Sequence, residues 1–204
     1  MLNLKIKKMK NAILSIIFLS LCTVAFAQKK VSFGLRGAAN ISNISNTNLE
    51  PKVGPYIGAL VHFRFSKLYA LQPELGYSNQ GGDAPRGFDD GVDVHYLSLA
   101  ITNNFFIKNS GFHFIISPSL DFDIDDSPIS IANGDNDNDF TFLDMSIGLG
   151  FGYQLKSGLS IDMRYKQGVI DVFSYGWLGS SNLDDDNDNQ LNNLFQLGVT
   201  YKFN

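Results

Sequence analysis

Apolar and polar residues alternate with a period of two along much of the chain, a pattern that indicates β-strands. Eight stretches show it: 31–40, 53–65, 68–80, 94–107, 112–124, 142–155, 159–171 and 191–203. No stretch has the three- and four-residue apolar spacing of an amphipathic helix. The pattern predicts an all-β protein with eight strands. Most of them are long enough for a tilted membrane crossing of ~9–11 residues.

The connections between these strands alternate in length. Three are tight turns, at Ser66-Lys67, Lys108–Gly111 and Lys156–Gly158, and four are long, at 41–52, 82–93, 125–141 and 172–190. Short turns at one end and long loops at the other are typical of hairpins joined into an up-and-down barrel. We therefore predict an eight-stranded antiparallel barrel, with short periplasmic turns and longer outward loops.

The two faces of the strands differ in chemistry. One face carries large Phe, Tyr, Leu and Ile side chains, and the other carries glycines, serines and charges. The interior of an eight-stranded barrel is only just filled by side chains, so the large apolar face should point outward to lipid. Tyrosines near strand ends fit the aromatic girdles of outer-membrane barrels: Tyr69, Tyr77, Tyr153, Tyr165 and Tyr201. The sequence thus predicts a transmembrane β-barrel, whose closure satisfies every backbone group in hydrocarbon.

Charged residues of the polar face should then lie in the lumen. The candidates for an ion network are Arg36, Arg64, Glu74, Asp121, Asp144, Asp162, Arg164 and Lys166. Because an unpaired buried charge is costly, we expect these side chains to pair. They would form either a plug or a gated polar conduit. The narrow interior favours the plug and little or no conductance.

The first 27 residues have the three parts of a secretory signal peptide. Lysines at 5, 7, 8 and 10 precede an apolar run at 12–27, which ends in the small-residue site Ala25-Phe26-Ala27. This run is short of the ~20 residues that a spanning helix needs. We therefore expect a cleaved signal peptide at 1–27, a barrel domain at 28–204 and a location in the outer membrane of a Gram-negative cell.

Composition narrows the function further. Cleavage would remove four of the 16 Lys and Arg residues and none of the 20 Asp and Glu residues, leaving a net charge of −8. Such an acidic exported chain lacks the basic footprint of a nucleic-acid binder. The single cysteine, Cys22, lies in the predicted signal peptide, so the mature chain has no disulfide and no thiolate site.

Two acidic loops carry the alternating aspartates of calcium-binding loops. The residues are Asp135, Asp137 and Asp139 in one loop and Asp184, Asp186 and Asp188 in the other. An EF-hand also needs Gly at its sixth position and Glu at its twelfth, and neither loop has them. The loops are thus either solvated, turn-rich segments or a weak surface Ca²⁺ site.

We expect no enzyme activity and no other cofactor. Catalysis needs a nucleophile, a base and an orienting group within reach of one another. The chain has three histidines, His62, His95 and His113. Ser98 is close to His95 in sequence but should face the opposite side of its strand, so the two do not form a catalytic pair.

Several segments resemble a known family. "FGLRGAANIS" and "GPYIGALVHFRFSKLYALQPELGYSNQGG" are similar to the opening hairpins of small outer-membrane β-barrels of Bacteroidota. The likeness covers essentially the whole mature chain. These proteins are described as porin-family or PorT-like and have an OmpA-like eight-stranded barrel. The resemblance implies this fold, and one class within the family serves a protein secretion and gliding system.

The final stretch, "QLGVTYKFN", should pair with residues 31–40 to close the barrel. It also resembles the C-terminal signal that the barrel-insertion machinery reads, through Gln196, Gly198, Tyr201 and Phe203. We therefore expect outer-membrane lipid and the insertion machinery as partners, together with envelope proteins. The expected role is structural or interactive at the cell surface. The alternatives are a component of a secretion or gliding apparatus and a narrow porin-like channel.

Overall fold

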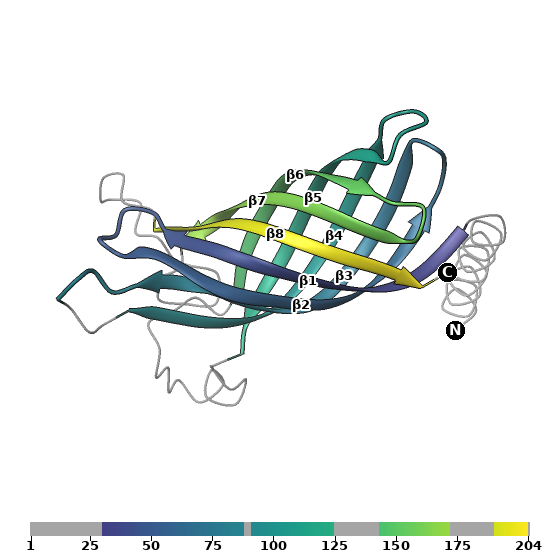
Figure 1. Cartoon of the computed structure of the whole chain (residues 1–204). Helices are drawn as coiled ribbons and strands as arrows, with labels where there is room; N and C mark the ends of the chain where they lie inside the picture. The colour runs from purple at the N-terminus through teal and green to yellow at the C-terminus, as the bar shows by residue number, and fades with distance from the viewer. Residues whose placement is uncertain (1–29, 88–90, 125–142, 172–189, 204) are drawn as a thin grey trace, which may run out of the picture. The chain divides into compact units, whose positions relative to one another are not determined.

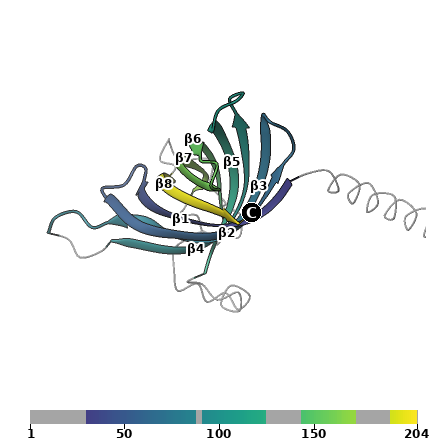
Figure 2. The ribbon, with the colours of Figure 1, turned by 45° about the vertical axis from the view of Figure 1, so that its right-hand side comes forward.

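A computed structural model describes residues 30–87, 91–124, 143–171 and 190–203. The eight strands are β1 (Lys30–Ile44), β2 (Glu50–Arg64), β3 (Tyr69–Asp83), β4 (Val92–Phe106), β5 (Phe112–Asp123), β6 (Leu143–Gln154), β7 (Leu159–Asp171) and β8 (Leu191–Phe203). Each pairs with its neighbour in the chain, and the sheet closes into a barrel (Figures 1 and 2). The predicted eight-stranded all-β barrel is confirmed.

The seam between the first and last strands closes the barrel. β1 pairs antiparallel with β8 from Phe33–Phe203 to Ile44–Asn192. The pairing continues past the end of β1, where the Ser45 amide donates to the Leu191 carbonyl at 2.9 Å. This confirms that the last strand pairs with the first, so neither strand leaves an open edge.

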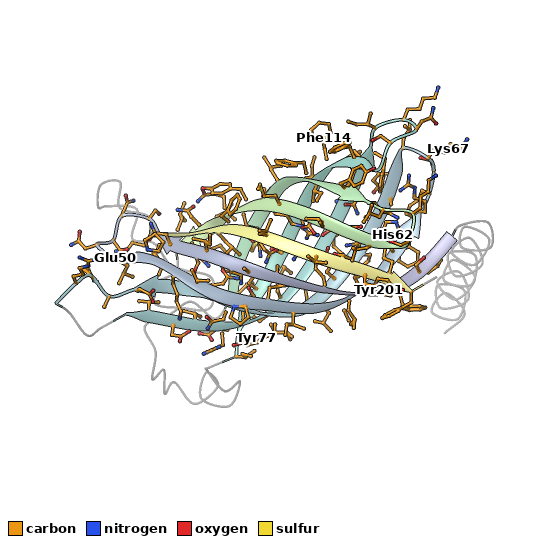
Figure 3. All side chains as sticks on the ribbon, in the orientation of Figure 1. Glu50, His62, Lys67, Tyr77, Phe114 and Tyr201 are labelled. Carbon is orange, nitrogen blue, oxygen red and sulfur yellow. The ribbon has the colours of Figure 1, made fainter. Side chains whose placement is uncertain are left out.

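The apolar face points outward. Phe33 is 65% exposed and Leu149 57%, whereas Arg36 and Asp121 are each only 1% exposed. Figure 3 shows Phe114 and Tyr201 projecting away from the barrel. This arrangement confirms the assignment of the two faces, because the outer wall offers hydrocarbon contacts while polar groups fill the lumen.

Strands at the loop end are longer than the alternation predicted. β1 continues to Ile44 and β2 starts at Glu50, so the connection predicted at 41–52 is mostly strand. Ser42 and Asn43 are polar residues of the kind that is common in loops. They still pair with β8, because backbone hydrogen bonding continues where the outward side chains stop being apolar.

Two outward-facing prolines interrupt the ladders of β2–β3 and β4–β5. Pro73 lies opposite Val61, where the pairing skips from Leu60–Glu74 to Phe63–Leu71. Pro118 lies at a similar gap, between Ala100–Ser119 and Asn103–Ile116. A proline has no N–H to donate, so each one removes a ladder bond.

The Asn103 side chain compensates in part for the gap at Pro118. Its amide donates to the Ile101 carbonyl at 3.0 Å and to the Ile116 carbonyl at 3.2 Å. Pro73, Ile101 and Pro118 also line an apolar groove of about 770 Å³ on the outer wall. The wall is therefore both hollowed and weakly paired at this place.

Aromatic rings line the turn end of the barrel. Tyr69 lies 5.6 Å from Phe65 and 5.4 Å from Phe105, measured between ring centroids. Farther round the wall, Phe112 and Tyr153 are 4.7 Å apart. These rings form the kind of girdle that marks a membrane interface. Among the described residues, no helix is long and apolar enough to cross a membrane.

Candidate functional site

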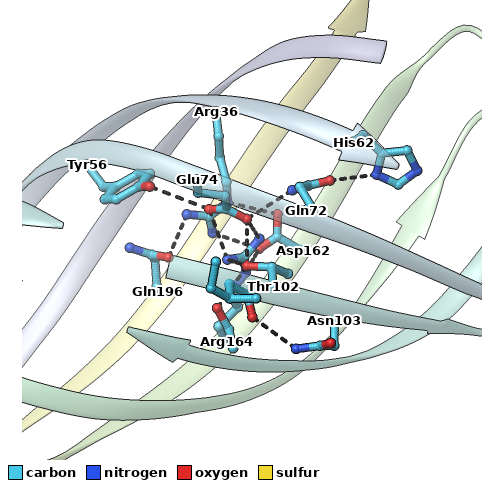
Figure 4. A network of polar contacts seen from close by, with 12 residues as sticks. Arg36, Tyr56, His62, Gln72, Glu74, Thr102, Asn103, Asp162, Arg164 and Gln196 are labelled. Carbon is cyan, nitrogen blue, oxygen red and sulfur yellow. Dashed lines mark hydrogen bonds and ion pairs between the residues drawn. The ribbon is translucent and has the colours of Figure 1, made fainter. Parts of the chain in front are cut away.

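Four charged side chains from three strands meet in the middle of the lumen (Figure 4). Arg36 on β1 donates to Asp162 on β7, with Nη2 at 2.7 Å from Oδ1 and Nε at 3.3 Å from Oδ2. Arg164 holds the same Asp162 Oδ1 through Nε at 2.7 Å. Its two terminal nitrogens also donate to Glu74 on β3, with Nη2 at 3.0 Å from Oε1 and Nη1 at 3.2 Å from Oε2. We call these four residues the central network.

The central network is buried and balanced in charge. The side chains of Arg36, Glu74, Asp162 and Arg164 are between 1% and 5% exposed. Two guanidinium groups face two carboxylates, and each carboxylate accepts hydrogen bonds from at least one arginine. Bidentate arginine–carboxylate pairs of this kind are strong and geometrically specific. The network therefore fixes strands on opposite sides of the lumen to one another.

Neutral side chains complete the hydrogen bonding of the central network. Thr102 Oγ1 and Gln72 Nε2 donate to Glu74 Oε1 at 2.8 and 2.9 Å. Arg36 Nη1 donates to Gln196 Oε1 at 2.6 Å. The Gln196 amide in turn donates to Asn40 at 2.8 Å. Arg36 and Glu74 thus have neutral partners beyond their ion pairs, which a buried network needs.

Glycines make room for two large side chains in the lumen, Arg36 and Tyr56. Arg36 lies over the Tyr56 ring, with Cζ 5.1 Å from the centroid. A Cβ at Gly58 or Gly76, which pair across β2 and β3, would come within 2.7 Å of the Tyr56 hydroxyl. A Cβ at Gly198 would collide with the Arg36 guanidinium. These glycines therefore determine where the tyrosine and the arginine can lie.

A second, acidic group lies nearer the loop end of the lumen. Lys166 Nζ donates to Asp121 Oδ2 at 3.0 Å. Asp144 stands directly across from Asp121 on the neighbouring strand, and both are at most 3% exposed. Within the described chain, Asp121 Oδ1 and Asp144 Oδ1 accept no hydrogen bond. Lys166 thus pairs with one of two adjacent carboxylates.

Arg64 does not join the lumen ion network, which corrects its sequence assignment. Its guanidinium lies over the Phe106 ring, 3.5 Å from the centroid. It donates to the carbonyls of Ser66 and Lys67 at 2.8 and 2.9 Å. The residue is the last of β2, so its side chain reaches the turn instead of the middle of the lumen. The other seven residues of the predicted network all lie buried inside the barrel.

A small cavity lies on the turn side of the central network. It has a volume of about 10 Å³ and is bordered among others by His113, Asp162 and Lys202. This volume holds about one water molecule at most. His62, which is 4% exposed, fills further space and contacts Gln72 Oε1 at 2.9 Å. This part of the lumen is packed with side chains.

The four residues of the predicted assembly signal divide between the two faces of β8. Gln196 and Gly198 face the lumen, where they contact Arg36. Tyr201 and Phe203 face outward, about half exposed, with ring centroids 5.4 Å apart. The same strand thus contributes to the lumen network and to the aromatic girdle.

The described part of the chain offers no group of three or more His, Cys, Asp or Glu side chains arranged for a metal ion. The aspartates predicted as a calcium site, at 135–139 and 184–188, lie outside the described residues. His95 and Ser98 face opposite sides of β4, as expected. Ser98 is buried in the lumen, and His95 contacts the Tyr77 hydroxyl at 2.5 Å near the outer wall.

Several hydrogen-bond partners of the central network cannot be recognised from the sequence pattern. Tyr56, Gln72 and Thr102 occupy lumen positions by strand parity, but they are uncharged, so the sequence pattern does not distinguish them from other lumen residues. The signal available for Tyr56 was its place between Gly54 and Gly58, where a large ring on the small-residue face needs space. The sequence pattern assigns Gln196 to the assembly signal, and its contact with Arg36 depends on the register of the closing seam.

Comparison with solved structures shows a likeness of fold. Ail of Yersinia pestis, solved in a phospholipid nanodisc, superposes with a TM-score of 0.51 at 15% identity, over 85% of this chain and 100% of that one. Neisserial surface protein A gives 0.48 at 14% identity, over 85% and 97%. OprG of Pseudomonas aeruginosa gives 0.45 at 15% identity, over 86% and 97%. No curated protein matches the chain.

A family model provides the assignment. The model of the outer membrane protein beta-barrel domain matches residues 26–174, well over half of the chain. The match includes β1 to β7, which carry the four charged residues of the central network. With its closed barrel, outward apolar face and polar lumen, the chain belongs to the outer membrane protein β-barrel domain family.

Proposed function

We propose that this protein is a non-conducting outer-membrane barrel with a structural or interaction role at the cell surface. The observation that carries the proposal is the central network, which bridges β1, β3 and β7 across the middle of the lumen. A conduit for ions or solutes needs a continuous polar path. Paired side chains occupy that path here, and they would have to separate before a solute could pass.

The energetics of the central network support a permanent plug. Removing one partner of a buried ion pair typically lowers stability by about 3–5 kcal/mol. Glu74 accepts hydrogen bonds from Arg164, Thr102 and Gln72, so opening the lumen would break several of them together. A lumen closed in this way would favour work done at the surface of the barrel.

Conductance in planar bilayers tests the proposal. The wild-type protein should give no steady current. Glu74→Ala combined with Arg164→Ala removes one cation and one anion and leaves Arg36 paired with Asp162. This double variant should conduct measurably, because it takes two bulky side chains out of the path. Steady large currents from the wild type would overturn the plug and favour the narrow porin-like channel.

The resemblance to PorT-like barrels supports a second candidate, a subunit of a secretion or gliding apparatus. A machine subunit would hold defined partners, whereas a free-standing barrel would not. Native purification from envelope membranes, followed by mass spectrometry, separates the two. A reproducible set of envelope proteins present in stoichiometric amounts would favour the apparatus, and recovery of the barrel alone would exclude it.

Export by a cleaved signal peptide is part of both proposals. The basic residues and the apolar run before Gln28 support cleavage after Ala27. The mass of the protein isolated from outer membranes tests this directly. A mature chain that begins at Gln28 is expected, and an intact Met1 would contradict the proposal.

A further inference from the structure

Among the described residues, the turn end of the barrel carries basic side chains and no Asp or Glu. Each of the three tight turns carries an exposed lysine: Lys67 between β2 and β3, Lys108 between β4 and β5, and Lys156 between β6 and β7. No Asp or Glu occurs within residues 62–73, 101–120, 147–161 or 197–203. The three lysines, which we call the turn lysines, form no ion pair with any described residue. They are therefore available to an anionic partner.

Hydrogen bonds hold the turns in defined shapes. Ser66 Oγ accepts from the amides of Leu68 and Tyr69 at 3.1 and 3.0 Å. In the next turn, Ser110 Oγ accepts from the Phe112 amide at 3.0 Å. In the third, the Leu155 amide donates to the Leu159 carbonyl at 2.8 Å. The turn lysines thus project from fixed backbones, which lowers the entropic cost of binding.

The turn lysines lie just beyond the aromatic girdle. Lys67 is two residues from Tyr69, and Lys156 is three from Tyr153. Aromatic rings occupy the interface between hydrocarbon and head groups, and long basic side chains next to them reach the head groups. Figure 3 shows Lys67 at the end of the barrel opposite Glu50. This places the lysine charges at the level of lipid phosphates.

We propose that the turn lysines form a surface that binds anionic phospholipid head groups in the periplasmic leaflet of the outer membrane. The three charges are distributed over three separate hairpins. Such a distribution matches the ring of lipids around a barrel better than it matches one compact protein partner. The opposite end carries Glu50, Asp83 and Asp93, so the attraction should be confined to the turn end. The inference rests on membership of the family and not on whether the lumen conducts.

Lipid enrichment in reconstituted protein tests the proposal. The full protein is inserted into vesicles of phosphatidylcholine mixed with phosphatidylglycerol, and the co-isolated lipids are counted by native mass spectrometry. A basic residue near an anionic surface is worth roughly fivefold in affinity. We expect the wild type to retain phosphatidylglycerol preferentially, and high salt to abolish this preference.

Charge variants make the test specific. Lys67→Gln with Lys108→Gln and Lys156→Gln should remove the preference, and the corresponding three Lys→Arg changes should keep it. Two single substitutions make a matched pair of test and control. Lys108→Gln should lower the enrichment about fivefold. Arg86→Gln, an exposed cation in the connection between β3 and β4 at the loop end, should leave it unchanged.

Three outcomes would overturn the proposal. Equal phosphatidylglycerol enrichment in the wild type and the triple Gln variant would show that the lysines do not select the lipid. Displacement of the lipid by soluble glycerol phosphate would assign the site to a free anion. A periplasmic protein retained only by the lysine-bearing forms, with lipid enrichment unaffected, would assign the surface to a protein. Conductance is measured separately, so none of these outcomes bears on the plug.

Discussion

Arg164 is the residue on which the central network depends most. It contacts Glu74 and Asp162 at the same time, with three of its hydrogen bonds at 2.7–3.2 Å going to carboxylate oxygens. Lysine could not replace it, because a point charge lacks the fork that holds two carboxylates from different strands. Removing it would leave Glu74 without its ion-pair partner and Asp162 with Arg36 alone.

Arg164→Met should therefore destabilise the barrel by about 3–5 kcal/mol. The free energy of unfolding in urea, measured from lipid vesicles by circular dichroism, checks this value. Arg64→Met is the matched control, because Arg64 bonds only turn carbonyls and sits partly exposed over Phe106. A similar loss for both variants would mean that the network contributes no more than a surface contact.

Gly198→Ala should disturb the central network without changing any charge. The new Cβ would meet the Arg36 guanidinium, which cannot move freely because Asp162 and Gln196 hold it. We expect a loss of about 1–3 kcal/mol in the free energy of unfolding. Gly37→Ala, on the outward face with no atom within 4 Å of its added Cβ, should be tolerated. Equal tolerance of both changes would contradict the packing argument.

At the scale of the element, β8 has three roles: it closes the barrel, contacts the central network in the lumen and contributes two rings to the aromatic girdle. Its backbone pairs with both β1 and β7, Gln196 and Gly198 face Arg36, and Tyr201 and Phe203 face outward. A strand that completes the barrel must reach its final place before the network can form. Changes in β8 should therefore affect assembly as well as stability.

Phe203→Asp should lower the amount of barrel inserted in the outer membrane, measured by quantitative immunoblot of membrane fractions. Phe65→Asp provides the control, because Phe65 belongs to the same girdle and is also exposed to lipid. A charge at either ring is unfavourable at the interface. A specific role in assembly predicts a larger loss for Phe203. Equal losses of inserted barrel in the two variants would mean that Phe203 acts only as a lipid contact.

Strand alternation made most elements predictable, because one face of every strand meets hydrocarbon and the other meets the lumen. The ends of the strands were less predictable: Ser42 and Asn43 look like loop residues, yet they pair with β8. The charges at 36, 74, 162 and 164 could be assigned to the lumen by parity. Their exact partners could not, since these depend on the stagger between strands that are not neighbours.

At the scale of the whole molecule, charge varies along the barrel axis. The turn end carries the turn lysines, the middle is balanced by the central network, and nearer the loops Lys166 pairs with Asp121, which lies opposite Asp144. The proposed binding of anionic lipid at one end and the proposed plug at the middle thus depend on different residues. Variants of the turn lysines should leave bilayer conductance at the wild-type level, and a change in conductance would show that the two are coupled.

The prolines at 73 and 118 have a consequence for how the wall moves over time. Where Val61 and Ile101 lack full ladder partners, local opening breaks fewer bonds, and it should be frequent. Hydrogen–deuterium exchange in vesicles should show amides near Val61 and Ile101 exchanging faster than those between Ser160 and Gln167, where β7 pairs with both β6 and β8 without a gap. Uniform exchange around the barrel would contradict this. Local opening of the wall would then begin where a proline lacks the backbone N–H donor, while the hydrogen bonds in the lumen behind it remain formed.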